Sequence, residues 1–203
     1  MKLYGSLTSP FVRTVRIAAI ELGLDREVEL TMTVVRPTQP NRDYGVAVNP
    51  LRRVPALETD EGDVIIDSRV IVEFLNNRAN GSLIPRDFDA RISCLNRHAI
   101  VSGATEALVS AMYETKLRPE ERRWKDWAED QIDKAEAAFV WAESNIADFS
   151  AAFDLSAIAL VALIDYAGFR FAHIPWLKRL PSVAAFAADA NKRPSVRDTA
   201  PRE

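Results

Sequence analysis

Thr8 and Ser9 are neighbouring hydroxyl side chains near the N-terminus, and their position suits them to chemistry on an anion. They follow a short apolar stretch, residues 2–5, and precede Pro10, which opens a segment with helical periodicity. Serine before proline is typical of a helix start, so Ser9 is predicted to be an N-cap. Because a helix N-terminus has unpaired N–H groups and a partial positive charge, a hydroxyl group there can help to hold a thiolate. A helix cap without chemistry is the simpler interpretation of these residues alone.

Two further motifs could contribute to the same site. Val54-Pro55 precedes a short apolar strand, and a cis bond there would turn the backbone of Val54 outward. Since only about one X–Pro bond in twenty is cis in folded proteins, these two residues by themselves favour the trans form. Asp67-Ser68 lies between a predicted strand and a predicted helix, where either residue could simply be the N-cap.

Residues 1–78 alternate between strand and helix, and this order would bring the three motifs together. The predicted elements are a strand at 2–5, a helix from 10 to 22, a strand at 28–35, a loop or short irregular helix at 36–49, strands at 56–57 and 64–66 joined by a hairpin turn, and a helix from 68. The first two strands are expected to be parallel. The βαβ-ββα order is typical of a thioredoxin-like domain, with all three motifs at one edge of the sheet.

The second half of the chain is predicted to be helical. Residues 79–88 have the turn chemistry of a linker, and residues 89–203 show no convincing strand pattern. The expected helices run from the cap Asp89 to about Glu114, from Arg118-Pro119 onward, from the cap Asp154 onward, and from 182 to 191, with an irregular surface tail at 195–203. Trp124 and Trp127 begin an apolar stripe, which indicates core or interface rather than a ligand platform.

The composition excludes several classes of function. The chain has 203 residues and a formal net charge of −3, with no block of basic residues, so nucleic acid is not an expected partner. The longest apolar run, residues 155–164, is far shorter than the roughly 20 residues of a membrane span. Cys94 is the only cysteine, and His98 and His173 lie far apart, so we expect neither a disulfide nor a metal site. A cytoplasmic location is expected.

The three motifs, in this order, resemble those of the cytosolic glutathione S-transferases. The resemblance covers the whole chain and is closest to bacterial, serine-type members. It rests on Ser9-Pro10-Phe11, on the run from Asn49 to Leu57 (NPLRRVPAL), on Asp67-Ser68 and on the C-terminal run from Arg193 to Val196. It implies a thioredoxin-like domain at 1–78, a linker at 79–88 and an all-helical domain at 89–203. It also implies glutathione as co-substrate without a metal, and a homodimer.

The resemblance assigns the thiol chemistry to Ser9, whose hydroxyl group would donate to the glutathione sulfur. A free thiol has a pKa of about 8.5, so a hydrogen bond to the sulfur and a helix N-terminus would favour the thiolate nucleophile. Thr8 is the alternative hydroxyl group. Cys94 lies in the second domain, which makes the cysteine-type, glutaredoxin-like members poor models.

The same resemblance implies how the rest of glutathione would be bound. The backbone of Val54, before a cis Pro55, would pair with the cysteinyl part as a short strand does. Asp67 would take the γ-glutamyl ammonium, while Ser68 and the helix start would take its carboxylate. Phe11 is also expected beside glutathione.

Two positions in the loop before Val54 differ from the family pattern. Arg53 replaces a common Lys and could bind the glycine carboxylate with a fork of N–H groups. Arg52 replaces a usual Gly, so a positive φ at this position would cost conformational free energy. The Arg52 side chain could also be a second cation for the glycine carboxylate. In the second domain, Ala157 replaces the usual acidic end of a helix-capping motif, which concerns stability rather than chemistry.

The second substrate implied by the family is a small apolar electrophile held between the domains. Phe11, Met112 and Tyr113 are candidates for lining its pocket, and each could instead be ordinary core. Glu106 could reach the glutathione ammonium of a neighbouring subunit. The implied function is transfer of glutathione, as its thiolate, to that electrophile. The same site residues would be found in two alternatives: a glutathione-binding or interaction module with little catalysis, and a glutathione-dependent peroxidase, dehalogenase or isomerase.

Overall fold

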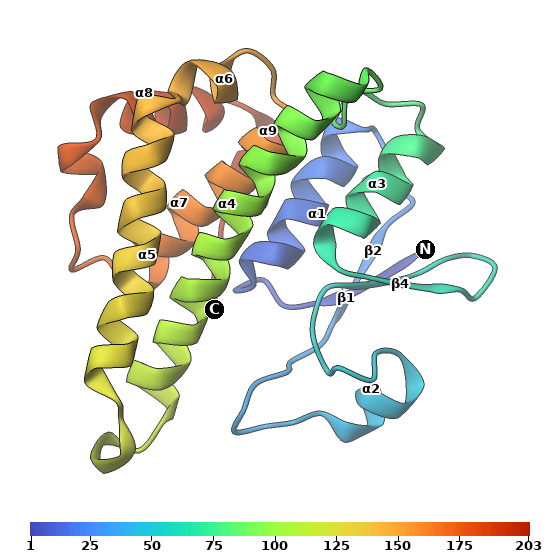
Figure 1. Ribbon diagram of the computed structural model, residues 1–203. Helices are drawn as coiled ribbons and strands as arrows, with labels where there is room; N and C mark the ends of the chain where they lie inside the picture. The colour runs from blue at the N-terminus through green and yellow to red at the C-terminus, as the bar shows by residue number, and fades with distance from the viewer.

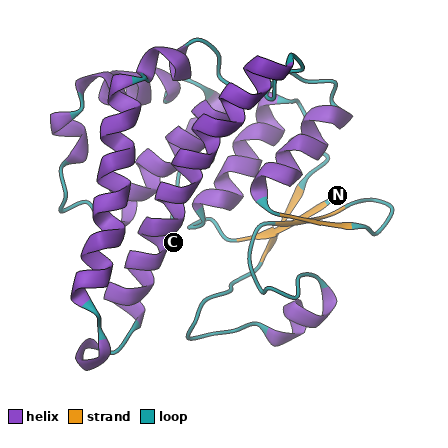
Figure 2. Cartoon of the chain, viewed as in Figure 1, coloured by secondary structure: helices purple, strands orange, loops and turns teal.

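The computed structural model describes residues 1–203, and its first half is built on a four-stranded mixed sheet (Figures 1 and 2). The strand order is β2-β1-β3-β4, with β1 parallel to β2 and antiparallel to β3, and β4 antiparallel to β3. The elements are β1 (Lys2–Gly5), α1 (Pro10–Glu21), β2 (Glu29–Met32), α2 (Arg42–Ala47), β3 (Ala56–Glu58), β4 (Val64–Ile66) and α3 (Ser68–Arg78). Helices α1 and α3 cover one face of the sheet and α2 lies on the other side (Figure 1). The thioredoxin-like arrangement predicted for this half is confirmed.

The second half is helical, as expected. It comprises α4 (Phe88–Met112), a π-helical turn η1 (Tyr113–Leu117), a 3₁₀ turn η2 (Glu120–Arg122), α5 (Lys125–Ser144), α6 (Ile146–Ser150), α7 (Leu155–Arg170), a 3₁₀ turn η3 (Trp176–Arg179), α8 (Pro181–Ala190) and α9 (Pro194–Arg197). Helices α4 and α5 lie side by side and form a long hairpin (Figure 1). None of the helices combines the length and the apolar character that crossing a bilayer requires.

Helix α7 lies at the centre of the molecule because it is apolar on nearly all sides. Of its 16 residues, 12 are buried, and it packs against both α1 and α4. The buried apolar side chains form one continuous cluster that includes Leu3 and Val12 from the first half and Leu108 and Ile158 from the second. The two halves therefore share one hydrophobic core.

Arg13 of α1 adds a polar connection to this shared core. Its guanidinium is 2% exposed, forms a 2.6 Å ion pair with Asp165 of α7, and donates to the carbonyl of Val196 at 3.2 Å. Burial lowers the pKa of Arg13, and Asp165 opposes that shift. The guanidinium stays charged because arginine begins from so high a pKa.

Two expected helix boundaries were wrong, and with them the expected environment of Trp124. The first long helix is capped by Asp87 rather than Asp89. The run Arg118-Pro119 opens only the short turn η2, and α5 begins later, at Lys125. The backbone is extended at Arg123, and the Glu114 carboxylate accepts the N–H of Trp124 at 2.7 Å, which fixes the start of α5 there. Trp124 thus precedes the helix and is 66% exposed, so it is not a core residue.

The tail at 195–203 was also expected to be irregular surface chain, and its first residues are instead helical. Pro194 opens α9, and Ser195, Val196 and Thr199 are buried. Arg193 holds the start of this helix by donating to both carboxylate oxygens of Glu21, at 3.0 and 2.6 Å. A charged pair and a proline at the first helical position together anchor a segment that is too short to show periodicity.

Candidate functional site

The strand register brings the three sequence motifs to one edge of the sheet. Tyr4 of β1 pairs with Ala56 of β3, and Ala56 pairs with Ile66 of β4. The segment that follows β1, the Val54-Pro55 bond before β3 and the Asp67-Ser68 pair after β4 all lie just beyond these paired residues. The N-termini of α1 and α3 consequently meet at the same edge (Figure 1).

Ser9 is the N-cap of α1, as predicted. Its Oγ accepts the N–H of Val12 at 3.3 Å, and its own O–H donates to no group of the chain. The Oγ1 of Thr8, in contrast, is 3.2 Å from the Oγ of Ser6 and shares a hydrogen bond with it. Ser9 therefore combines a free O–H donor with the positive end of the α1 dipole.

The loop before β3 presents an unpaired stretch of backbone. The Val54-Pro55 bond is cis, which the family resemblance implied. Neither the N–H nor the C=O of Val54 has a hydrogen-bond partner in the chain, whereas Pro55 and Ala56 are buried. Arg52 has φ = 50°, so this position keeps a left-handed backbone although it carries a side chain.

Two residues that the sequence reasoning missed hold this loop in place. The side-chain amide of Asn49 and the hydroxyl of Tyr44 both donate to the carbonyl of Arg53, at 2.9 and 2.8 Å. Asn49 also accepts the N–H of Leu51 at 3.0 Å and is almost fully buried. The Asn-Pro pair at 49–50 is a turn signal that could have indicated Asn49, but no signal marked Tyr44.

Asp67 is the N-cap of α3 and has φ = 72°. Its Oδ1 accepts the N–H groups of Arg69 and Val70, at 2.9 and 3.4 Å, and its second oxygen has no partner in the chain. Ser68 is the buried first residue of the helix. The pair thus offers one free carboxylate oxygen beside a helix N-terminus, a combination that can bind an ammonium and a carboxylate together.

His98 of α4 is a further titratable group near this pair. It is 5% exposed, and burial lowers its pKa to about 4, with Arg69 acting in the same direction and Asp67 and Asp154 opposing. The imidazole is therefore neutral at pH 7.

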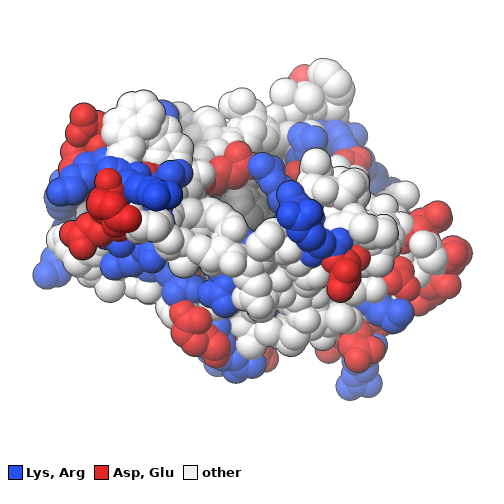
Figure 3. Space-filling view, turned by 90° about the horizontal axis from the view of Figure 1, so that it is seen from below, with Lys and Arg blue, Asp and Glu red and all other residues white.

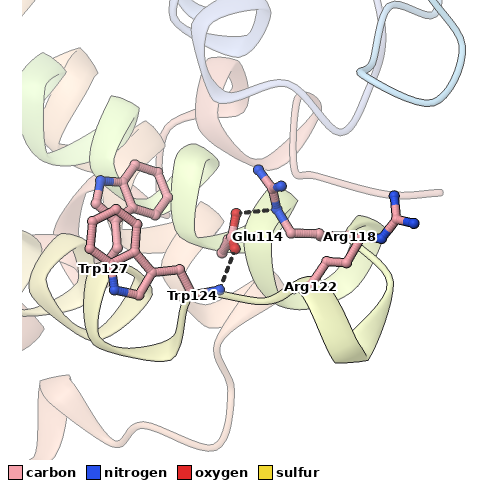
Figure 4. Close-up of a pocket in the computed structure, with 5 residues that line it drawn as sticks. All are labelled: Glu114, Arg118, Arg122, Trp124 and Trp127. Atoms are coloured by element: carbon pink, nitrogen blue, oxygen red, sulfur yellow. Dashed lines mark hydrogen bonds and ion pairs between the residues drawn. The ribbon is translucent and has the colours of Figure 1, made fainter.

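Two adjoining cavities lie where the first half faces the α4–α5 turn. The larger, of about 440 Å³, is lined by Pro37 and Thr38 from the first half and by residues from the second that include Ser110, Tyr113, Glu114, Arg118 and Trp127. The smaller, of about 350 Å³, is lined by Glu114, Arg118, Arg122, Trp124 and Trp127 (Figure 4). Seen from below, this end of the molecule is hollowed near its middle, with basic side chains and some acidic ones around the hollow (Figure 3).

The residues expected to form the second-substrate pocket are placed unequally. Tyr113 lines the larger cavity, and burial raises the pKa of its hydroxyl group while Arg36 and Arg53 lower it. Phe11 and Met112 are half-buried and line neither of the two cavities. Glu106 is exposed on α4 without an ion pair. No group of three or more His, Cys, Asp or Glu side chains is placed to hold a metal ion.

Comparison with known proteins relates both the sequence and the fold to one family. Residues 3–83 match the model of the glutathione S-transferase N-terminal domain. A structure of a glutathione transferase family member from Pseudomonas fluorescens Pf-5 with bound glutathione has 34% sequence identity and a TM-score of 0.96, covering 100% of this chain and 99% of that one. A glutathione S-transferase from Methylobacillus flagellatus KT, also with glutathione bound, has 32% identity and a TM-score of 0.87, covering 99% of each chain.

Two curated relatives match different lengths of this chain. The uncharacterised GST-like protein YibF of Escherichia coli K12 is 29% identical over 206 residues, covering 99% of this chain and 98% of its own. Maleylacetoacetate isomerase of Pseudomonas aeruginosa is 40% identical over 79 residues, which is 38% of this chain and 37% of that protein. The second match is thus confined to part of each chain.

Proposed function

Because the chain belongs to the glutathione S-transferase family, we propose that it binds glutathione at the sheet edge, stabilises the thiolate and transfers it to an electrophile. The observation that supports this most directly is the position of the Ser9 hydroxyl group. It lies at the N-terminus of α1, without an acceptor in the chain, on the same edge as the unpaired backbone of Val54 and the free Asp67 oxygen.

The thiolate would be stabilised by donors that are already oriented. The Ser9 O–H and the first N–H groups of α1 would donate to the sulfur, which lowers the thiol pKa because they bind the charged form more strongly. Ser9 is preferred to Thr8 for this role because Ser9 caps α1, whereas the Thr8 hydroxyl group shares a hydrogen bond with Ser6. This difference supports the proposal that the chain is of the serine type.

The rest of the tripeptide would occupy groups that lack partners in the chain. The backbone N–H of Val54 would donate one hydrogen bond to the cysteinyl unit, and its C=O would accept one from it, as between two neighbouring strands. Asp67 would bind the γ-glutamyl ammonium, and Ser68 with the start of α3 would bind its carboxylate. Arg53, which forms no ion pair within the chain, would bind the glycine carboxylate, with Arg52 as a second cation.

The domain roles follow from these positions. Residues 1–78 would form the glutathione-binding domain, 79–88 the linker, and 89–203 the helical domain that completes the electrophile pocket. Tyr113, which lines the larger cavity, would form part of that pocket, with Phe11 and Met112 outside the lining of the cavity.

We propose that the chain forms a homodimer through apolar side chains that the monomer leaves exposed. Leu51, Val70, Phe88 and Ile92 are exposed on the loop before β3, on α3 and on the first turns of α4. Large apolar side chains gathered on neighbouring elements are typical of an interface. Glu106, also on α4, would approach the glutathione ammonium of the second subunit in such a dimer.

A glutathione-dependent isomerase is the second candidate. The 40% identity with part of maleylacetoacetate isomerase favours it. The site at the sheet edge would serve either reaction, since both need the same thiolate.

The test compares glutathione retention and conjugation of a neutral chlorodinitrobenzene for the wild type, Ser9→Ala and the matched hydroxyl variant Thr8→Val. Removing one hydrogen-bond donor to a negative charge that develops in the reaction lowers the catalytic rate about a hundredfold. Ser9→Ala should therefore have a kcat/KM about a hundredfold below that of the wild type and keep most of its affinity for glutathione. Thr8→Val should resemble the wild type. Unchanged turnover in Ser9→Ala would remove Ser9 from this role, and tight retention with no turnover in the wild type would favour a binding module instead.

A further inference from the structure

The lining of the two cavities at the α4–α5 turn includes charged side chains beside aromatic ones, which bears on the second substrate. They share Glu114, Arg118 and Trp127 and so form one continuous depression. In Figure 4, the indole rings of Trp124 and Trp127 lie on one side of the Glu114 carboxylate, and the Arg118 and Arg122 side chains lie on the other. The depression thus combines a flat aromatic wall with guanidinium groups.

Glu114 does not make this depression acidic. Its side chain is nearly buried, and each carboxylate oxygen has a donor: Oε2 accepts the Nε of Arg118 at 2.7 Å, and Oε1 accepts the backbone N–H of Trp124 at 2.7 Å. The Trp124 N–H and Arg118 lower the pKa of Glu114. The carboxylate is therefore ionised at pH 7, and its charge is paired with that of Arg118 and also acts on Arg123.

The remaining cations around the depression have no carboxylate partner. Arg122 and Arg123 form no ion pair, and the Nε of Arg123 donates to the carbonyl of Arg118 at 3.0 Å. Arg36 is held by the amide oxygen of Gln39 through two of its nitrogens, at 3.3 and 3.1 Å. Both Arg36 and Arg53 act electrostatically on Tyr113, which lines the larger cavity. Among the charged side chains that line the depression, there are therefore two arginines, Arg118 and Arg122, and one carboxylate, Glu114.

From this arrangement we propose that the second substrate is an anionic electrophile with a flat, conjugated body. Its carboxylate would be bound by Arg122 and Arg118, whose guanidinium groups can donate two N–H groups to one carboxylate. Its body would lie against the indoles of Trp124 and Trp127, and its reactive carbon would point toward the glutathione sulfur. This proposal rests on the proposed transferase function and replaces the apolar electrophile expected from the sequence with a charged one.

The structure accounts for why the carboxylate would use the Arg122 side of the depression. In the proposed complex Arg53 is occupied by the glycine carboxylate of glutathione, which leaves Arg122 and Arg36 as cations without a carboxylate partner. The excess charge would also raise the local concentration of an anionic substrate, an effect that weakens with salt.

The experiment compares a chlorodinitrobenzoate with the corresponding neutral benzamide. In both compounds the thiol first loses its proton to solvent, and the thiolate then attacks the ring carbon that carries chlorine. A C–S bond forms, the C–Cl bond breaks, and chloride leaves as the anion. Each kcat/KM is divided by the uncatalysed rate constant with glutathione, so that the intrinsic reactivity of the two rings cancels. The wild type should prefer the benzoate about tenfold on this normalised scale, as one charge-assisted contact would give.

Arg122→Met should abolish most of that preference while the rate with the benzamide stays within twofold of the wild type, because Arg122 contacts no group of the chain's glutathione site. Arg36→Met is a second variant that should reduce the preference less. Arg26→Met removes the same charge from an exposed, unpaired arginine beyond the far end of α1 and should leave the preference unchanged. Raising the ionic strength should reduce the preference of the wild type.

The outcomes separate the two proposals. Turnover of both compounds with equal normalised rates, or a preference that Arg122→Met and Arg26→Met alter equally, would overturn the anionic electrophile and leave the transferase function intact. No turnover of either compound, in a protein that retains glutathione, would overturn the transferase function and this proposal with it. The benzamide rate is the internal check that Arg122→Met is folded.

Discussion

The hydroxyl group of Tyr44 donates a 2.8 Å hydrogen bond to the carbonyl of Arg53, the residue before Val54. Together with the amide of Asn49, it occupies both lone pairs of that carbonyl. The loop that presents Val54 is thereby fixed before any ligand arrives, and pre-ordering of this kind saves the entropy that binding would otherwise lose.

Tyr44→Phe should weaken glutathione binding about fivefold, because it removes one neutral hydrogen bond of about 1 kcal/mol from the loop without removing the ring. Isothermal titration with glutathione measures this effect. Tyr4→Phe is the matched control, since the Tyr4 hydroxyl group bonds to Glu58 on β3 rather than to the loop. Equal losses in the two variants would mean that the loop is not held by Tyr44.

Asp154→Ala should lower the free energy of unfolding by about 4 kcal/mol. Asp154 caps α7 through the N–H of Ala157, and its second oxygen binds Arg97 at 2.9 Å in a nearly buried ion pair. The variant would leave Arg97 buried without a charged partner, and breaking a buried pair costs about 3–5 kcal/mol.

Chemical denaturation of Asp154→Ala and Asp87→Ala provides the comparison. Asp87 is also a helix N-cap but is exposed and has no ion pair, so its loss should cost about 1 kcal/mol. Similar values for the two variants would show that the ion pair with Arg97 adds nothing to the cap.

Lowering the pH should destabilise the protein through His98. Burial lowers its pKa from 6.5 in the unfolded chain to about 4 in the folded protein, so the unfolded state takes up the proton first as the pH falls. The stability that the neutral imidazole provides is complete above pH 6.5 and is lost progressively down to about pH 4, a total of roughly 3 kcal/mol.

Denaturation curves recorded between pH 7 and pH 4 test this expectation. The decline should be clearly smaller for His98→Gln than for the wild type, whereas His173→Gln, at an exposed position, should keep the wild-type decline. A decline that does not depend on residue 98 would assign the acid sensitivity to other groups.

Arg13→Met should lower the free energy of unfolding by about 2–3 kcal/mol. The change leaves Asp165 without its partner and removes one of the two donors to the carbonyl of Val196, the other being the Thr199 hydroxyl group, while the aliphatic stem of the side chain is kept. Because Asp165 is partly exposed, the loss is smaller than for a fully buried pair.

Arg179→Met breaks an exposed ion pair with Glu136 and is the control for Arg13→Met. Exposed ion pairs contribute about 0–1 kcal/mol to the free energy of unfolding, so chemical denaturation should give nearly the wild-type value for this variant. An equally small change in Arg13→Met would exclude Arg13 as a connection between the halves.

Local signals in the sequence were enough to predict much of the first half. The strand Lys2–Gly5 and the caps Ser9 and Asp154 were predicted correctly, because capping depends on residues within three positions of one another. Asp67 was one of the two residues predicted as possible caps of α3. The family resemblance, rather than the residues themselves, supplied the cis bond at Val54-Pro55.

Features that depend on distant partners were missed. The C-terminal segment is helical and buried because Glu21, far away in the sequence, binds Arg193. The start of α5 is delayed because Glu114 takes the N–H of Trp124. The depression at the α4–α5 turn combines residues 37–38 with residues 110–127, and neither segment shows a motif for such a site.

The continuous apolar core has a consequence for how the molecule melts. Since Leu3 and Val12 are in the same cluster as Leu108 and Ile158, neither half can open without exposing apolar surface of the other. The chain is therefore expected to unfold in a single cooperative transition rather than in two steps. Glutathione bound at the sheet edge would then raise the melting temperature of the helical half as much as that of the half that holds it.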